Sequence, residues 1–142
     1  MLDRLEGDDG ARPGESIEQT RRRHAQERYD RALRATYTSE EQIEAAKQRS
    51  LQTPMLAVKW GKKKLGIYRD RLADLQQREA TLTESNSPIP DALKEDIVTG
   101  ESDVARLERD LELKQRSVDR IVARYDADKD RYRKLRAPRR KR

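Results

Sequence analysis

A heptad pattern of apolar residues between Ile97 and Leu135 constrains the fold of this chain more than any other feature. Every seventh residue falls into one column of core positions, and the residues three places further on form a second column. The two columns are Ile97, Val104, Leu111, Val118, Tyr125 and Tyr132, and Gly100, Leu107, Lys114, Ile121, Asp128 and Leu135. Such a pattern indicates a long helix that buries this seam against a partner helix.

The segment upstream of this seam can supply the partner helix. Its own columns are Leu51, Val58, Leu65 and Leu72, and Gly61, Tyr68, Leu75 and Leu82. Residues 39–84 and 90–136 are nearly equal in length, each roughly 70 Å as a helix, so each can cover the other. The residues between them, SNSPIP, favour a turn because Pro88 restricts the residue before it and Pro90 suits the first turn of a helix.

We therefore predict an all-α fold, a long antiparallel two-helix coiled-coil hairpin over residues 38–136, with helix 39–84, turn 85–89 and helix 90–136. Pro54 indicates either a kink or a restart in the first helix. One register places Leu65 near Leu107 and the other places Leu72 there; the first needs the shorter loop. The predicted hairpin core is Leu51, Val58, Leu65, Tyr68, Leu72, Leu75, Ile97, Val104, Leu107, Leu111, Val118, Ile121, Tyr125 and Tyr132.

The two ends of the chain differ from the heptad region in composition. Residues 1–15 are rich in glycine and acidic residues, which predicts a disordered leader. Ser16 followed by Gln19 predicts a capping box that opens a short basic helix over residues 16–35. Residues 137–142 are predicted to form a disordered basic tail.

Charge and hydropathy limit the class of protein. The chain is 33% hydrophobic and 42% charged, too little apolar surface for a thick globular core but enough for a helix pair. Residues 131–142 hold eight basic residues and no acidic one, which leaves 25 of the 33 basic residues against all 27 acidic ones. The net charge of +6 therefore comes from residues 131–142. No apolar run approaches the length of a membrane span, about 18 residues.

Three segments carry a resemblance to a known family: LRATYTSEEQIEAAKQRSL at 33–51, PIPDAL at 88–93 and ARYDADKDRYRKL at 123–135. They resemble the charged helical C-terminal region of proteobacterial envelope proteins that carry an N-terminal domain of unknown function, number 4124. The resemblance implies a helical region without an assigned activity. The stretch MLAVKWGKKKLGIY at 55–68 departs from the Ala-rich helix of that family, so we expect a partner to bind there.

The candidate partner-binding residues combine this stretch with the tail: Trp60, Lys62, Lys63, Lys64, Arg136, Arg139, Arg140, Lys141 and Arg142. One interpretation is a basic patch in which Trp60 and Tyr68 accompany lysines that meet phosphates. The other is that Trp60 covers the side of the hairpin while the lysines stay solvated.

Signals for catalysis and for bound groups are missing. The chain has no cysteine and one histidine, His24, which we interpret as a solvent-facing residue of the basic helix. Asp126, Asp128 and Asp130 copy the opening of a calcium loop, but Arg131 stands where glycine is required. We predict no enzyme, no cofactor and no metal site.

The sequence favours a non-enzymatic structural module that docks on a protein partner in a larger assembly, of the envelope or of secretion, and that forms a homodimer as one option. The first alternative is a basic protein associated with nucleic acid or the ribosome. The second is a chaperone-like coiled coil of an export apparatus. The first residues lack the apolar core of a secretory signal, so we expect a cytoplasmic location as written, or a periplasmic one if Met1 is not the native start.

Overall fold

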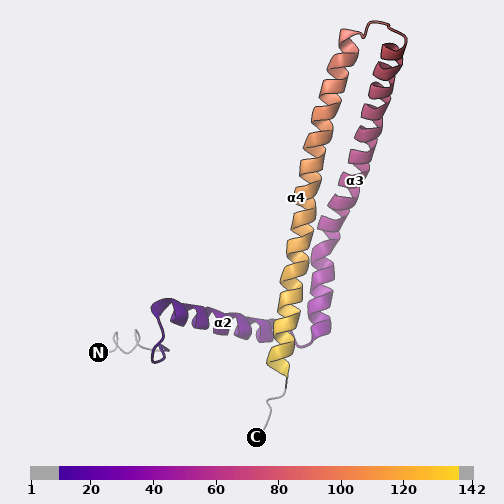
Figure 1. Ribbon diagram of the computed structural model, residues 1–142. Helices are drawn as coiled ribbons and strands as arrows, with labels where there is room; N and C mark the ends of the chain where they lie inside the picture. The colour runs from indigo at the N-terminus through magenta and orange to yellow at the C-terminus, as the bar shows by residue number, and fades with distance from the viewer. Residues whose placement is uncertain (1–9, 138–142) are drawn as a thin grey trace. The chain divides into compact units, whose positions relative to one another are not determined.

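The computed structural model describes residues 10–137, and these residues form three helices and no strand. Helix α2 is Ile17–Thr36, α3 is Glu40–Glu84 and α4 is Asp91–Arg136 (Figure 1). The all-α prediction is confirmed. The helices belong to two units: a central unit, Lys47–Ala123, and a terminal unit made of the described residues before Lys47 and after Ala123.

Side chains cap the starts of the first two helices. The hydroxyl of Ser16 accepts a hydrogen bond from the Gln19 amide at 3.0 Å, and the Gln19 side chain accepts one from the Ser16 amide at 2.8 Å. This is the predicted capping box. At the start of α3, the hydroxyl of Ser39 accepts from the Gln42 amide at 3.2 Å, and Glu40 and Glu41 lie at the positive end of the helix.

Helix α3 continues through Pro54 and ends in a Schellman motif. Pro54 lies inside the single helix, so the chain does not restart there. Asn86 adopts a left-handed conformation with φ of 55°, which asparagine tolerates better than most residues. The amide of Ser87 donates to the Leu82 carbonyl at 2.9 Å, and the amide of Asn86 donates to the Thr83 carbonyl at 3.1 Å. These bonds supply donors to carbonyls that have no partner within the helix at its C-terminal end.

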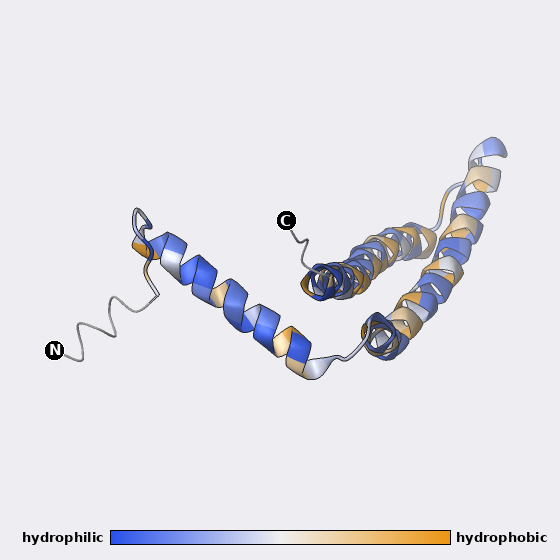
Figure 2. Ribbon diagram, turned by 90° about the horizontal axis from the view of Figure 1, so that it is seen from below, coloured by the Kyte–Doolittle hydropathy of each residue, from blue (hydrophilic) through white to orange (hydrophobic). Residues whose placement is uncertain are grey.

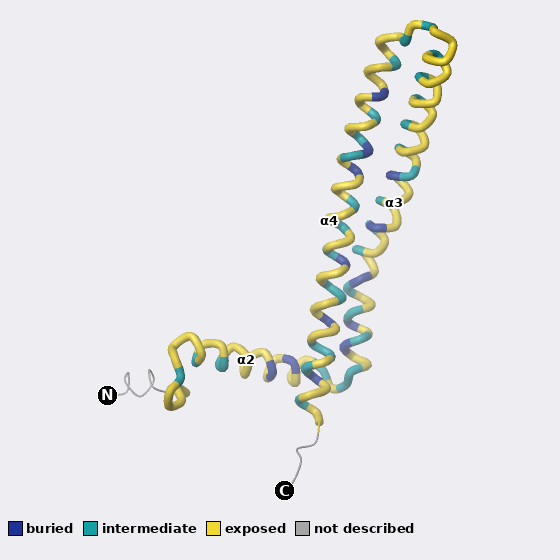
Figure 3. The backbone as a smooth tube through the Cα atoms, viewed as in Figure 1, coloured by how far each residue is buried: buried dark blue, intermediate teal, exposed yellow. Residues whose placement is uncertain are grey.

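Two apolar clusters join α3 and α4 within the central unit. Leu51 and Val58 pack with Val118, while Leu65 packs with Leu107 and Val104. The later residues of α3 thus meet the earlier residues of α4, and both Leu65 and Leu72 pack in the cluster of Leu107. Buried positions lie on the facing sides of the two helices, and exposed positions cover their other sides (Figure 3).

Two glycines allow α3 and α4 to approach each other. A Cβ on Gly61 would lie 3.2 Å from Leu111 Cδ1, and one on Gly100 would lie 3.1 Å from Leu72 Cδ1. Lys114 lays its stem over Gly61, with its Cδ 3.8 Å from that Cβ position, and its Nζ pairs with Asp110 at 3.0 Å. These glycines therefore serve contacts within the chain, and Lys114 behaves as a snorkelling residue.

The terminal unit has its own core. Leu33 of α2 is 4% exposed and Ile43 of α3 is fully buried, together with Ala46, Tyr125 and Tyr132. The heptad pattern included the two tyrosines but not Ile43. Ion pairs of Arg133 with Glu40 at 2.7 Å and of Lys129 with Glu44 at 3.2 Å flank this core. Hydrophilic residues predominate along all three helices (Figure 2), so both cores are thin.

Candidate interaction surfaces

One face of the middle of α3 leaves three large apolar side chains uncovered. Leu56, Trp60 and Ile67 are 51%, 55% and 52% exposed, whereas Val58 and Leu65 on the other face are less than a tenth exposed. Because successive residues turn about 100° around a helix, the three exposed side chains lie opposite the buried column. Exposed apolar residues that share one face are a mark of a binding surface.

The spacing of these residues is that of a second seam. Leu56, Trp60, Lys63 and Ile67 follow one another at intervals of four, three and four residues, the spacing of d and a positions in a coiled coil. We call these four residues the outer seam. With Trp60 at position a, Lys59 and Lys64 occupy the flanking g and e positions, where charged residues select the partner of a coiled coil.

The segment of α3 that carries the outer seam is basic. Residues 45–69 contain seven basic residues and no acidic one, and Arg69 is paired with Glu108 at 2.9 Å. Lys63 Nζ lies 5.1 Å from the centroid of the Trp60 ring, a cation–π contact. At an exposed site such a contact contributes about 0.5–1 kcal/mol, and it holds the indole in place. The outer seam therefore lies in a basic stretch of α3.

An open hollow adjoins the outer seam and shares Lys63 with it. Its volume is about 550 Å³, and Met55, a residue 53% exposed, forms part of it. The remaining lining residues are Val58, Lys59, Lys62, Lys63, Gln115 and Val118. With apolar side chains and lysines around it, the hollow can receive an apolar side chain of a partner bound along α3.

The residues selected from the sequence fall into different environments. Trp60 is 55% exposed, and Lys63 lies over its ring. Tyr68 packs on the cluster of Leu65, on a different face of α3 from Trp60. Lys62, Lys63 and Lys64 are exposed.

The predicted tail surface is only partly described. Arg136 donates to the Thr38 carbonyl at 2.9 Å and to the Tyr132 hydroxyl at 3.1 Å, so its guanidinium is engaged within the chain. The other selected tail residues lie outside the described residues: Arg139, Arg140, Lys141 and Arg142. Sequence reasoning did not select Leu56, Ile67 or Lys59, although their spacing from Trp60 was visible.

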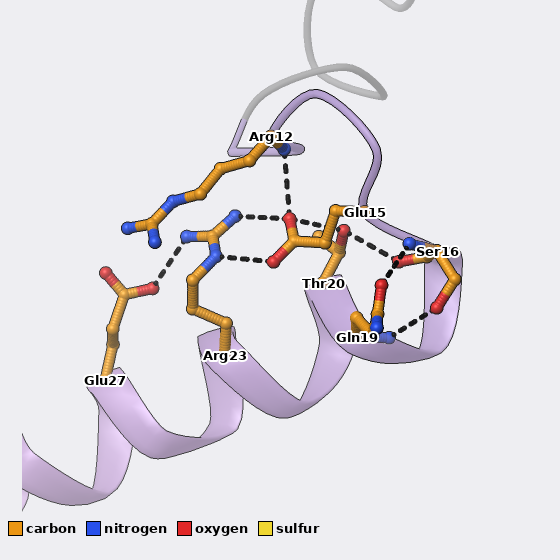
Figure 4. Close-up of polar contacts among 7 residues, drawn as sticks. All are labelled: Arg12, Glu15, Ser16, Gln19, Thr20, Arg23 and Glu27. Carbon is orange, nitrogen blue, oxygen red and sulfur yellow. Dashed lines mark hydrogen bonds and ion pairs between the residues drawn. The ribbon is translucent and has the colours of Figure 1, made fainter.

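Helix α2 begins in a polar network centred on Glu15 (Figure 4). Its carboxylate accepts two hydrogen bonds from Arg23, both at 3.0 Å, and one from the Arg12 amide at 2.9 Å. These bonds, those from Arg23 foremost, lower the pKa of Glu15 to about 2. Arg23 also pairs with Glu27 at 3.2 Å. The network ties the residues before α2 to its first two turns.

The buried face of α2 is attached to α4 by charged and polar contacts. Asp30, 8% exposed, accepts hydrogen bonds from Arg131 Nε and Nη2, both at 2.8 Å, and these bonds hold its pKa below the ordinary value. The hydroxyl of Tyr29 donates to Asp128. Burial, and then this hydrogen bond, raises the pKa of Tyr29 to about 12. Asp128, a polar residue in the heptad core column, thus serves to hold α2.

Within residues 10–137, no group of three or more histidine, cysteine or acidic residues is arranged to hold a metal ion. None of the helices described is both long and apolar enough to cross a membrane. No protein-family model, no curated protein and no solved structure matches the chain.

Proposed function

We propose that this chain is a non-enzymatic interaction module that docks an acidic amphipathic helix of a partner protein along the outer seam. The observation that carries this proposal is the row of Leu56, Trp60 and Ile67, each about half exposed, at coiled-coil spacing. A helix laid along this row would cover apolar surface that the chain itself leaves in water.

The scaffold for this function is an antiparallel coiled-coil hairpin formed by α3 and α4. Its support is the reversed order of contacts, in which Leu51 meets Val118 and Leu65 meets Leu107. The column of Val58 and Leu65 holds one face of α3 against α4, so the outer seam is presented by a helix whose orientation is set by packing. A preordered surface loses less conformational entropy on binding.

The charge pattern selects an acidic helix as the occupant. Lys59 and Lys64 flank the seam, and Lys63 lies in it, so glutamates at the facing e and g positions of a partner would meet ammonium groups. A partner helix with lysines at those positions would meet like charges. From the resemblance to envelope proteins, we propose that such a partner belongs to an assembly of the cell envelope.

The test uses Trp60 as its own reporter, since it is the single tryptophan of the chain. A synthetic helix with leucine at a and d and glutamate at e and g is titrated into the full chain, and the same helix with lysine at e and g serves as the charge control. We expect a blue shift of the Trp60 emission with the acidic helix and none with the basic one, because the indole leaves water only when the helix binds.

A pair of variants distinguishes binding at the outer seam from nonspecific hydrophobic binding. Ile67→Ala removes one apolar residue of the seam and is expected to weaken binding about tenfold, since burying such a side chain contributes about 1.5–3 kcal/mol when complete. Val98→Ala, on α4 and 65% exposed, is the matched control and is expected to leave binding unchanged. Equal affinity of the two variants, or an emission shift equal for both synthetic helices, would overturn the proposal.

The predicted homodimer is a separate outcome of the same experiment. If the Trp60 emission shifts on concentrating the chain alone, and sedimentation shows a dimer that Ile67→Ala dissociates, the occupant is a second copy and the acidic-helix proposal fails. A shift with anionic lipid vesicles but with neither synthetic helix would likewise assign the surface to lipid.

A further inference from the structure

Helix α2 carries a row of arginines opposite its buried face. Arg21, Arg28 and Arg31 are exposed and fall on one side of the helix, whereas Asp30 and Leu33 are buried on the other. The three arginines span ten residues, about 15 Å along the helix axis. We call these three residues the arginine row.

The charge of the arginine row is not balanced within α2. The helix contains six arginines and three acidic residues. Each acid is engaged by a different arginine: Glu18 by Arg22 at 2.6 Å, Glu27 by Arg23 at 3.2 Å, and Asp30 by Arg131 of α4 at 2.8 Å. Among the residues described, no ion pair involves a member of the arginine row. The acids are thus neutralised by other arginines.

The attachment of α2 fixes which way the row faces. The two hydrogen bonds from Arg131 to Asp30, together with the bond from Tyr29 to Asp128, hold the opposite side of α2 against α4. The arginine row is therefore directed to solvent before any ligand binds. Preorganised guanidinium groups lose less entropy for each contact that they form.

The composition of the row favours phosphate groups as its ligand. A guanidinium binds a phosphate through two parallel hydrogen bonds, which an ammonium cannot do. Along one strand of a duplex, phosphates recur about every 3.4 Å of axis, so a row about 15 Å long can reach about four of them. Between Arg21 and Arg31 the only ring on this face is that of His24, which is partly buried beside Gly10, and the face has no large apolar residue to enter a bilayer.

We propose that α2 binds the phosphate backbone of duplex nucleic acid through Arg21, Arg28 and Arg31, without reading the base sequence. This site is independent of the outer seam, because it uses another helix and another class of ligand. The neighbouring Arg22 and Arg23 are paired with acids and are not part of the proposed site.

The test compares two variants of the full chain with equal loss of charge. In the first, Arg21, Arg28 and Arg31 are each replaced by glutamine; in the control, Arg106, Arg116 and Arg120 of α4 are replaced by glutamine. Circular dichroism checks that both stay helical. Binding of two fluorescent 20-base-pair DNA duplexes of unrelated sequence is measured by anisotropy at several salt concentrations between 50 and 200 mM.

We expect the first variant to lose at least tenfold in affinity at 50 mM salt and to reduce the slope of log K against log salt by about 2.7, which is about 0.9 for each phosphate that is no longer neutralised. The control variant should keep its slope within one unit of the original, and the two duplexes should bind alike. A third variant with lysine at the three positions should keep most of the slope while binding more weakly, because it keeps charge and loses the bidentate geometry.

Three results would overturn the proposal. One is equal affinity of the glutamine variant and the charge-matched control, which would assign duplex binding to other basic residues, including those of residues 138–142. Another is the absence of duplex binding by the unmodified chain at 50 mM salt. The third is a loss of binding to anionic vesicles, with duplex binding intact, in the glutamine variant.

Discussion

The outer seam of α3 and the arginine row of α2 are both basic, yet they differ in what surrounds the charge. The outer seam places Lys63 between exposed apolar residues, and Lys63 lies over the Trp60 ring. The arginine row has arginine in place of lysine and no large apolar neighbour between its ends. Positive charge alone therefore does not identify a ligand; we propose different ligands for the two surfaces because of the apolar side chains beside the charge.

The two surfaces also differ in how the chain supports them. The outer seam is presented by α3, whose opposite face packs Val58 and Leu65 in apolar clusters of the central unit. The arginine row is presented by α2, whose buried face combines Leu33 with the hydrogen-bonded Asp30. Apolar packing is insensitive to salt and pH, whereas charged attachment responds to both.

The largest expected difference between the two surfaces is in how far their binding affinities fall as the salt concentration rises. From 50 to 200 mM salt, duplex binding should fall roughly 40-fold if three phosphates are neutralised. Binding of the acidic helix to the outer seam should fall less than about fivefold, because exposed ion pairs contribute little beside apolar burial. Anisotropy measures the first and Trp60 emission the second. Equal salt dependence of the two would show that the surfaces do not differ in this way.

Replacing Asp30 by asparagine should loosen α2 and spare the outer seam. Hydrogen bonds to charged groups contribute about 1.5–3 kcal/mol, and because Arg131 is more than a third exposed and can be resolvated we expect only about 1–2 kcal/mol. Amide exchange in α2 should therefore accelerate about tenfold. The acidic helix should still shift the Trp60 emission as before.

Asp119→Asn on α4 is the control for this variant, since the Asp119 carboxylate accepts only an exposed hydrogen bond from Gln115 among the contacts observed. Its α2 amides should exchange at the original rate. If Asp30→Asn leaves the exchange of α2 unchanged, charged attachment does not hold this helix.

The smallest expected effect is a pH dependence at the start of α2. The pKa of Glu15 is lowered from 4.5 to about 2, so its contribution to stability is complete above about pH 4.5 and is lost as the pH falls toward 2. The carboxyl carbon of Glu15 should titrate near pH 2 by NMR, and amides of the first turns of α2 should lose protection over that window. In Arg23→Gln the midpoint should rise toward 4.5; an unchanged midpoint would contradict the assigned cause.

Most of the secondary structure could be predicted from local patterns. The Ser16 and Gln19 pair predicted the start of α2, and the prolines at 88 and 90 predicted the turn between α3 and α4. These signals act within a few residues of the chain, so no knowledge of distant contacts was required. Pro54 was the exception, because its local effect could not decide between a kink and a break, and α3 in fact continues through it.

The outer seam was visible as a spacing but could not be recognised as a surface. Leu56, Trp60 and Ile67 are as apolar as the core residues, and only the burial of Val58 and Leu65 on the other face shows which set remains in water. Likewise, the heptad pattern did not explain why Asp128, a charged residue, stands at a core position. Its hydrogen bond comes from Tyr29, 99 residues earlier, a contact that no periodicity encodes.

By itself, the sequence determined that this chain is helical, where its helices start and stop except at Pro54, and which columns of α3 and α4 are apolar enough to be buried. These properties follow from capping, proline geometry and a repeat of seven, all of which are local. The tertiary structure alone decided that α2 is attached through Asp30 and Arg131, and which basic residues are left without an acidic partner. Pairing depends on residues about a hundred positions apart, and only folding brings them within hydrogen-bonding distance.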